Sequence, residues 1–188
     1  MSYFKSYFLE AGKTLAGLVE LSEEIEILAI KMWHSLLAGK SVYWFGNGGS
    51  ASDAEHLAAE LAGRFRFDRK PLSSFALTAN SSIITAISND YGYEQVFARQ
   101  VQAYVKEGDI VIGISTSGKS KNVQLALDQA KTLGALSVAL VGSKANLLAD
   151  CNYVIRVPSD ITSHIQEAHI AIGQVLCGYI ENKILNND

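Results

Sequence analysis

The sequence predicts an α/β domain in which a parallel sheet is covered by helices on both faces. From residue 41 onward, short runs rich in Val and Ile alternate with segments of helical periodicity. The short runs show little polar alternation, as expected for strands whose two faces are both covered. A chain of 188 residues suits one domain. We therefore expect a three-layer sandwich that forms one domain over residues 1–188.

Two helices are expected before the first strand. Apolar residues recur at helical spacing over residues 3–18 and again over residues 22–38. Both apolar stripes need cover, and the sheet offers them limited room. We expect residues 1–39 to pack against another subunit.

The rest of the chain supplies five expected strands and the helices between them. The strands are expected at 41–45, 74–78, 109–114, 136–141 and 153–157. The helices are expected at about 50–62, 81–88, 94–105, 119–133, 145–149 and 162–184. No interdomain linker and no internal repeat interrupts this order.

Composition excludes some classes of protein without naming one. Hydrophobic residues make up 48% and charged residues 19%, and only two prolines occur, which excludes a disordered or fibrous chain. The formal charge of −3 argues against a general nucleic-acid binder. Two cysteines form no disulfide framework, and the sequence has neither a signal-peptide pattern nor an apolar run of about 20 residues. We expect a cytoplasmic protein with no membrane partner and no direct nucleic-acid partner.

Two unusual loops follow expected strands, where parallel sheets bind ligands. The first, Gly46–Ser50, is glycine-rich and lets the backbone approach a ligand, with Ser50 placed to cap the next helix. It matches neither a dinucleotide fingerprint nor a Walker loop, so a tight turn with a cap is the alternative. The second, Ser115–Ser120, brings hydroxyls and backbone N–H groups to a helix N-terminus. It predicts a monophosphate site, and the alternative is a serine-rich loop with one cap.

Several polar pairs are further candidates. His56 and Glu60 lie four residues apart and therefore share one face of a helix. They could bind a metal, act as a catalytic base with its orienting partner, or form a surface ion pair. Gln166 could close a capping box with Ser163, and His169 could be a hydrogen-bonded core histidine.

Two remaining segments are interpreted from residues typical of turns and from their charges. The segment 89–92 has turn chemistry, although a carboxylate there could hold sugar hydroxyls. The basic, aromatic run 64–70 is expected to be a solvated loop with arginine salt bridges rather than a nucleic-acid site.

Taken jointly, these blocks resemble one family. The matching segments are 46–50, 53–56, 60–64, 88–92, 113–120 and 165–169, and they keep the family's order over nearly the whole chain. They resemble the sugar isomerase (SIS) domain family, and within it the sedoheptulose 7-phosphate isomerases. The resemblance implies a flavodoxin-like fold with a five-stranded parallel sheet, a homotetramer, and active sites at subunit boundaries. It also implies conversion of sedoheptulose 7-phosphate to D-glycero-D-manno-heptose 7-phosphate for heptose and lipopolysaccharide or capsule synthesis.

The resemblance also implies roles for individual residues. Glu60 is the expected proton-transfer base. The expected phosphate ligands are Ser115, Thr116, Ser117 and Ser120. The expected sugar contacts are Asn47, Gly48, Gly49, Ser50, Asn89, Asp90 and Gln166. In many members zinc is held by residues matching His56, Glu60 and Gln166 and by a histidine in the last helix.

One departure concerns that last histidine, which in the family is also the expected second catalytic acid/base, because its position is occupied by Gln174. A glutamine carbonyl binds a metal weakly, and its amide does not exchange a proton near neutral pH. Either another group, water or His164, then carries the second proton transfer, or the activity is weakened or changed. Two alternative functions stay open. One is a non-catalytic SIS-domain protein that associates with a bacterial replication initiator, and the other is an isomerase for a related phosphosugar.

Overall fold

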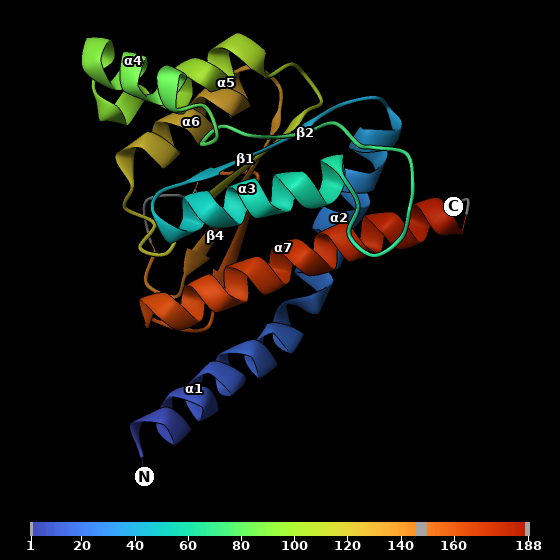
Figure 1. Ribbon diagram of the computed structural model, residues 1–188, viewed down its shortest axis with the longest axis vertical. Coiled ribbons are helices and arrows are strands. Elements are labelled where there is room, and N and C mark those ends of the chain that lie inside the picture. Colours follow the sequence, from blue (N-terminus) through green and yellow to red (C-terminus); the bar gives the residue numbers. More distant parts are fainter. Residues whose placement is uncertain (1, 146–149, 187–188) are drawn as a thin grey trace.

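The computed structural model describes residues 2–145 and 150–186, and five parallel strands form its sheet. The spatial order is β2-β1-β3-β4-β5 (Figure 1). The strands are β1 (Val42–Gly46), β2 (Ser74–Ala76), β3 (Ile110–Ser115), β4 (Leu136–Gly142) and β5 (Tyr153–Val157). All pairings are parallel, as the sequence predicts.

The helices follow the expected order. They are α1 (Tyr3–Gly17), η1 (Leu18–Leu21), α2 (Ser22–Leu37), α3 (Gly49–Ala62), α4 (Ser81–Tyr91), η2 (Tyr93–Gln95), α5 (Ala98–Tyr104), α6 (Lys121–Thr132) and α7 (Thr162–Leu185). Among the described helices, none is long and apolar enough to cross a membrane. The short helix expected at 145–149 falls, beyond Ala145, outside the described residues.

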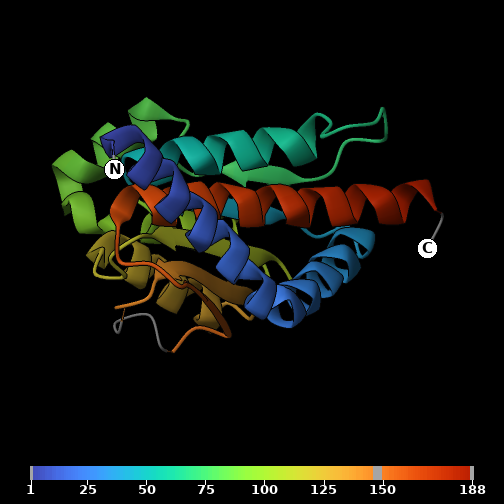
Figure 2. The same cartoon turned by 90° about the horizontal axis from the view of Figure 1, so that it is seen from below.

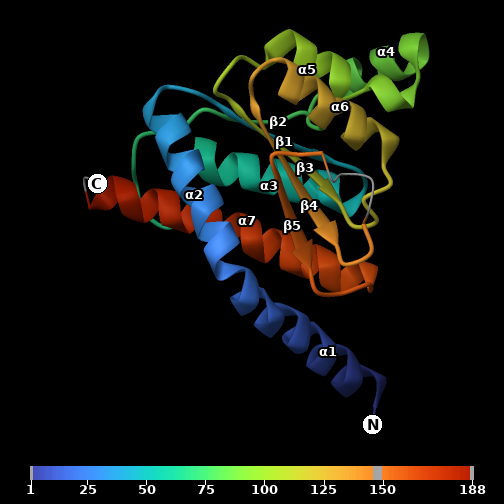
Figure 3. The same ribbon diagram turned by 180° about the vertical axis from the view of Figure 1, so that it is seen from behind.

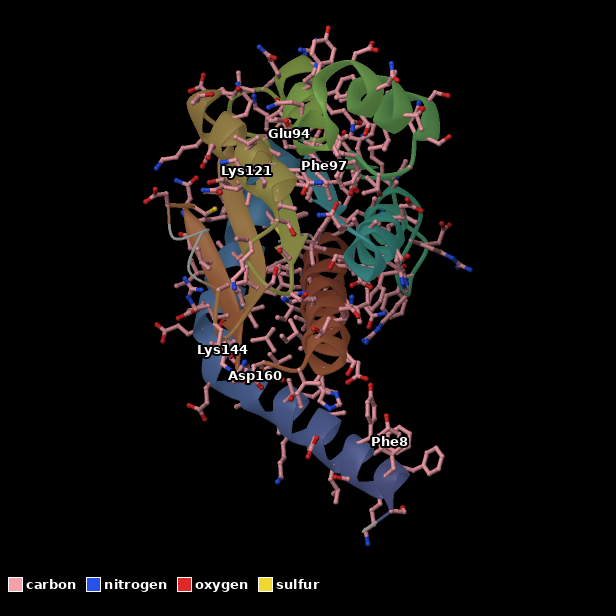
Figure 4. All side chains as sticks on the ribbon, turned by 90° about the vertical axis from the view of Figure 1, so that its left-hand side faces the viewer. Phe8, Glu94, Phe97, Lys121, Lys144 and Asp160 are labelled. Carbon is pink, nitrogen blue, oxygen red and sulfur yellow. The ribbon has the colours of Figure 1, made fainter. Side chains whose placement is uncertain are left out.

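The helices cover the sheet as two layers, so the central strands β1, β3 and β4 are buried on both faces, whereas the edge strands β2 and β5 are partly exposed. Figure 3 shows α2, α3 and α7 against one face, with α5 and α6 on the other. Adjacent strand residues point to opposite layers: Trp44 packs with the first group and Phe45 with the second. Phe97, labelled in Figure 4, lies 5.0 Å from Phe45 between ring centroids.

The segment after α4 differs from the expectation. The single helix expected over 94–105 is divided into η2 and α5, because Val96 and Phe97 turn into the core between them. Helix α4 also runs three residues further than expected, so Asn89 and Asp90 lie in its last turn. The turn comes only at Gly92, whose φ of +90° suits glycine.

The N-terminal helix extends away from the sheet (Figures 1 and 3). It is tied to α7 by Tyr7, whose hydroxyl donates to Glu167 Oε1 at 2.7 Å. Its aromatic side chains Tyr3, Phe4 and Phe8 are largely exposed, and Phe8 points away from the body in Figure 4. The apolar stripe expected on this helix is therefore left open within one chain.

Candidate active site

The sheet order places a crevice between β1 and β3. Strand β2 lies on one side of β1, and β3 lies on the other side, so the order of the strands reverses at β1. In parallel sheets, ligands bind at the carboxyl ends of the strands where the order reverses. The segments Gly46–Ser50 and Ser115–Ser120 follow these two strands. Gly46 pairs in register with Ile114, and a Cβ at Gly46 would lie 2.8 Å from the Ile114 carbonyl oxygen. The two loops predicted from the sequence are therefore neighbours.

The first loop begins α3 differently from the expectation. The helix starts at Gly49 with Gly48 as its N-cap, at φ +57°, and no side chain caps it. The prediction that Ser50 is the N-cap is wrong. The glycine at 48 lets the helix start earlier, so Ser50 is buried in the first turn and its N–H donates to the Asn47 carbonyl at 3.1 Å.

Asn47 bridges the crevice. Its side chain exchanges two hydrogen bonds of 2.9 Å with Asn122, in the first turn of α6, and accepts a third from the Tyr93 hydroxyl at 2.9 Å. The sequence interpretation did not include Asn122 or Tyr93. The position of Asn122, just after the serine-rich loop, was the only available signal.

The second loop borders a cavity of about 200 Å³. Ser115 donates to Ser120 Oγ at 3.1 Å, and the Lys119 N–H donates to Ser117 Oγ at 3.2 Å. Gly118 has φ +65°, and a side chain there would collide with Ala145. The cavity is lined by Thr116, Ser117, Lys119, Gly142, Ser143, Lys144, Ser159, Asp160, Thr162 and Ile165.

An exposed ion pair lies at the rim of this cavity. Lys144 and Asp160, labelled near each other in Figure 4, form a hydrogen bond. This bond and the charge of the lysine lower the pKa of the aspartate. Together with Lys119, the rim carries two cations and one carboxylate. Such a rim suits a small anion held mainly by hydroxyls and backbone N–H groups.

His56 and Glu60 meet on one face of α3, as their spacing predicts. The Nε2 of His56 lies 2.9 Å from Glu60 Oε1, and the two side chains are 51% and 18% exposed. A carboxylate only accepts, so Nε2 donates when Glu60 is ionised. Asp53 lies one turn before His56, and burial raises the pKa of its carboxyl, with His56 opposing the shift.

Helix α7 runs parallel to α3 (Figure 2). It carries the two candidate glutamines, Gln166 and Gln174. A Cβ at Gly49 would lie 2.6 Å from Gln166 Nε2, so this amide lies against the first loop. Further along, a side chain at Gly173 would collide with Leu57. The neighbouring Gln174 therefore lies at the level of the second half of α3.

Gln174 lines a surface hollow rather than joining the pair on α3. The hollow also contains Phe65 and Arg66. Within residues 2–145 and 150–186, no hydrogen bond joins Gln174 to His56 or Glu60. Its catalytic role stays a prediction.

The other candidates have partners of their own. The Asn89 amide donates to Asp90 Oδ1 at 2.8 Å, and both residues are exposed. His164 faces α1, with Nδ1 2.9 Å from Glu167 and its ring 4.6 Å from that of Tyr7. His169 is a core residue, and burial lowers its pKa to about 4, against a smaller opposing effect of the Val141 backbone.

The basic run 64–70 contains the expected salt bridge, but that bridge is buried rather than solvated. Arg69 Nε lies 3.4 Å from Glu181 Oε1, with both side chains almost fully covered. Arg69 also donates to the carbonyl oxygens of Glu60 and Leu61, at 2.6 and 2.8 Å. The run therefore closes the C-terminal end of the helix that carries Glu60.

A zinc site is only half supplied by these residues. His56 and Glu60 are ligand types that zinc prefers, whereas Gln166 and Gln174 offer amide oxygens. In the part of the chain that the structure describes, no three His, Cys, Asp or Glu side chains gather as a metal site. The donor set therefore does not fit a complete zinc site within one chain.

Comparison with known proteins identifies the family. The model of the SIS domain matches residues 6–142. A phosphoheptose isomerase of Akkermansia muciniphila is 41% identical over 97% of both chains. One of Aneurinibacillus thermoaerophilus is 47% identical over 90% of this chain and 85% of its own.

Solved structures agree with the sequence comparison. A phosphoheptose isomerase from Francisella tularensis superposes with a TM-score of 0.92 at 36% identity, over 96% of this chain and 97% of that one. A phosphoheptose isomerase from Neisseria gonorrhoeae gives 0.89 at 35% identity, over 95% and 97%. The chain belongs to the phosphoheptose isomerase family of SIS-domain proteins.

Proposed function

We propose that this chain is an aldose–ketose isomerase that converts sedoheptulose 7-phosphate to D-glycero-D-manno-heptose 7-phosphate, for heptose and lipopolysaccharide or capsule synthesis. The observation that carries the proposal is that two chemically suited groups follow two neighbouring strands, β1 and β3. A hydroxyl-lined anion cavity follows β3, and a histidine-bound carboxylate lies on the helix that follows β1. Membership of the phosphoheptose isomerase family supports the same reaction.

The phosphate would be held by Ser115, Thr116, Ser117 and Ser120. Backbone N–H groups at the start of α6 add to these hydroxyls, and the helix dipole favours the anion. Holding the phosphate fixes where C1 and C2 of the sugar lie. The sugar itself would contact Asn47, Gly48, Gly49, Ser50, Asn89, Asp90 and Gln166.

Glu60 would move the proton between the two carbons. The carboxylate removes a proton from C1 of the ketose, and the C1–C2 double bond forms as the C2 carbonyl oxygen takes up a proton. The enediol then loses the proton on O1 while C2 receives one from Glu60, which gives the aldose. His56 keeps the carboxylate oriented through its 2.9 Å hydrogen bond.

The proton transfers on oxygen need a second group. Gln174 cannot supply a proton near neutral pH. His164 is buried against α1, where its Nδ1 is hydrogen-bonded to Glu167 and its ring packs against that of Tyr7. We assign these oxygen transfers to water, with Gln174 as a neutral contact to the sugar hydroxyls.

The proposal includes zinc only as a weakly bound metal ion. His56 and Glu60 would supply two strong ligands, and Gln166 and Gln174 two weaker amide oxygens. We expect Gln174→His, which restores the ligand implied by the family, to raise zinc affinity.

The assembly is proposed to be a homotetramer in the cytoplasm. Residues 1–39 would form subunit contacts, since the aromatic face of α1 is open in one chain. Counted at 1.5 Å per residue, Glu60 lies about 16 Å along α3 from Gly49. This separation from the strand ends favours a site completed at a subunit boundary. The chain is proposed to act as one SIS domain over residues 1–188.

The direct test is turnover by the purified protein. Zinc-loaded and chelator-treated samples are incubated with sedoheptulose 7-phosphate, and the aldose is followed by NMR. We expect turnover in both samples. Absence of the aldose in both would refute the isomerase proposal.

A further inference from the structure

The unit formed by Asn47, Asn122 and Tyr93 has a fixed hydrogen-bond polarity. Asn47 lies at the end of β1 and is half-buried, whereas Asn122, on the other side of the crevice, is 4% exposed. A buried amide must satisfy its donors and acceptors locally. The direction of each bond therefore follows from the partners around it.

The backbone sets the orientation of Asn122. The N–H of Val123 donates to Asn122 Oδ1 at 2.9 Å. Exchanging the oxygen and nitrogen of this amide would place an NH₂ group against the backbone N–H, with no acceptor between them. The amide oxygen of Asn122 is thus fixed toward α6.

Asn47 takes its orientation from Asn122. Its Nδ2 donates to Asn122 Oδ1, and Asn122 Nδ2 donates back to Asn47 Oδ1, both at 2.9 Å. Flipping Asn47 alone would oppose oxygen to oxygen and nitrogen to nitrogen. The two amides therefore hold each other in one arrangement.

Tyr93 occupies the remaining acceptor position of Asn47. Its hydroxyl donates to Asn47 Oδ1 at 2.9 Å, although the residue as a whole is 53% exposed. The turn at Gly92 brings it there, at φ +90°, and a Cβ at Gly92 would lie 2.7 Å from the Glu94 carboxylate. A local backbone feature thus directs the tyrosine to the crevice.

These contacts leave the side-chain amide of Asn47 with one hydrogen-bond donor for a ligand. An amide oxygen accepts two hydrogen bonds, and both are used by Asn122 and Tyr93. An amide NH₂ donates two, and one of them goes to Asn122. Among the described residues nothing accepts the second Nδ2 hydrogen, so this donor is available to a ligand.

We infer that Asn122 and Tyr93 lock Asn47 so that it meets the bound sugar as a hydrogen-bond donor only, which makes the facing sugar group an acceptor oxygen. This inference rests on the proposed function, in which Asn47 contacts the sugar. Tyr93 is then a positioning residue that acts through Asn47. A fixed donor is suited to a carbonyl oxygen that gains negative charge as the enediol forms.

Two substitutions at Asn47 separate donor from acceptor. Asn47→Ala removes the contact, whereas Asn47→Asp replaces the donor by a carboxylate of the same shape. We expect kcat/KM of the Asp variant to be at least tenfold below that of the Ala variant, because the carboxylate repels an acceptor. An Asp variant equal to or better than the Ala variant would overturn the inference.

Tyr93→Phe tests the positioning role. We expect kcat to fall about fivefold, equivalent to one neutral hydrogen bond, with KM changed less than twofold. Tyr104→Phe is the matched control, since it removes an exposed tyrosine hydroxyl from α5. Equal effects of the two variants, or no effect of Tyr93→Phe on kcat, would contradict the inference.

A measurement without substrate keeps this inference separate from the proposed function. In the full-length protein labelled with ¹⁵N-asparagine, the side-chain amides of Asn47 and Asn122 should exchange slowly with solvent. Tyr93→Phe should shift the Asn47 amide signal, and Tyr104→Phe should not. Fast exchange of both amides would refute the lock, whereas absence of sugar turnover with protected amides would refute only the proposed function.

Discussion

The buried ion pair between Arg69 and Glu181 provides the clearest test of the structure's energetics. Glu181 is 1% exposed, and its carboxylate accepts backbone N–H bonds from Phe65, Arg66 and Phe67 at 3.1, 2.7 and 3.2 Å. Arg69, whose side chain is 2% exposed, links this carboxylate to the last carbonyls of α3. One acidic side chain of α7 therefore organises the loop that follows Glu60.

The substitution Glu181→Gln keeps the shape and removes the charge. Arg69 would then stay buried without its counter-ion, and an NH₂ group would face backbone N–H groups. Removing one partner of a buried pair costs about 3–5 kcal/mol. We expect the free energy of unfolding to fall by about that amount, which is a large part of a typical total of about 5–15 kcal/mol.

The assay is urea unfolding followed by circular dichroism, at one fixed protein concentration because assembly contributes to stability. Asp160→Asn is the control, since the Lys144–Asp160 pair is exposed and should leave the unfolding midpoint unchanged. The double variant Arg69→Met/Glu181→Gln should cost less than the sum of its parts. A loss below about 1 kcal/mol for Glu181→Gln would show that the pair does not hold this loop.

Three further predictions concern single side chains. Burial lowers the pKa of His169 to about 4 in the folded protein, against about 6.5 in the unfolded chain. Between these pH values the unfolded chain binds more protons than the folded protein. Up to about 3 kcal/mol of stability is therefore lost as the pH falls from 6.5 to 4. His169→Gln should flatten that part of the pH dependence of urea unfolding, and an unchanged slope would contradict the assignment. Position 118 has a φ of +65°, and a side chain there would collide with Ala145, so Gly118→Ala should weaken the thermal stabilisation given by inorganic phosphate. Gly12 has open space around it, so the control Gly12→Ala should leave this stabilisation unchanged. Equal responses of the two variants would refute the phosphate site. Burial raises the pKa of the Cys177 thiol to about 12, so it should resist iodoacetamide at pH 8 in the folded protein, and rapid labelling would show that it is accessible.

The layers and both strand-end loops could be predicted from the sequence because their signals are local. Val- and Ile-rich runs identify strands buried on both faces, and glycine or serine clusters after them mark ligand loops. Spacing alone placed His56 and Glu60 on one face, and their side chains do meet. The fold class follows from such patterns without knowledge of long-range contacts.

Other features could not be predicted because they depend on tertiary contacts. Nothing local shows that Tyr93 reaches Asn47, or that Glu181 gathers the N–H groups of a loop far away in sequence. Burial of Phe97 divides a segment whose periodicity suggested one helix. The cap assigned to Ser50 failed because Gly48, with a positive φ, allowed the helix to start earlier.

The measurement that tests the central claim most directly is proton exchange at the sugar carbons. The full-length protein is incubated with sedoheptulose 7-phosphate in D₂O, and deuterium at C1 of the ketose and C2 of the aldose is followed by NMR. We predict that Glu60→Gln lowers the exchange rate at least 100-fold, as expected for loss of a general base, and that Glu55→Gln, an exposed neighbour on α3, leaves it unchanged. A Glu60→Gln rate within tenfold of the unsubstituted protein would contradict the assignment of Glu60 as the base.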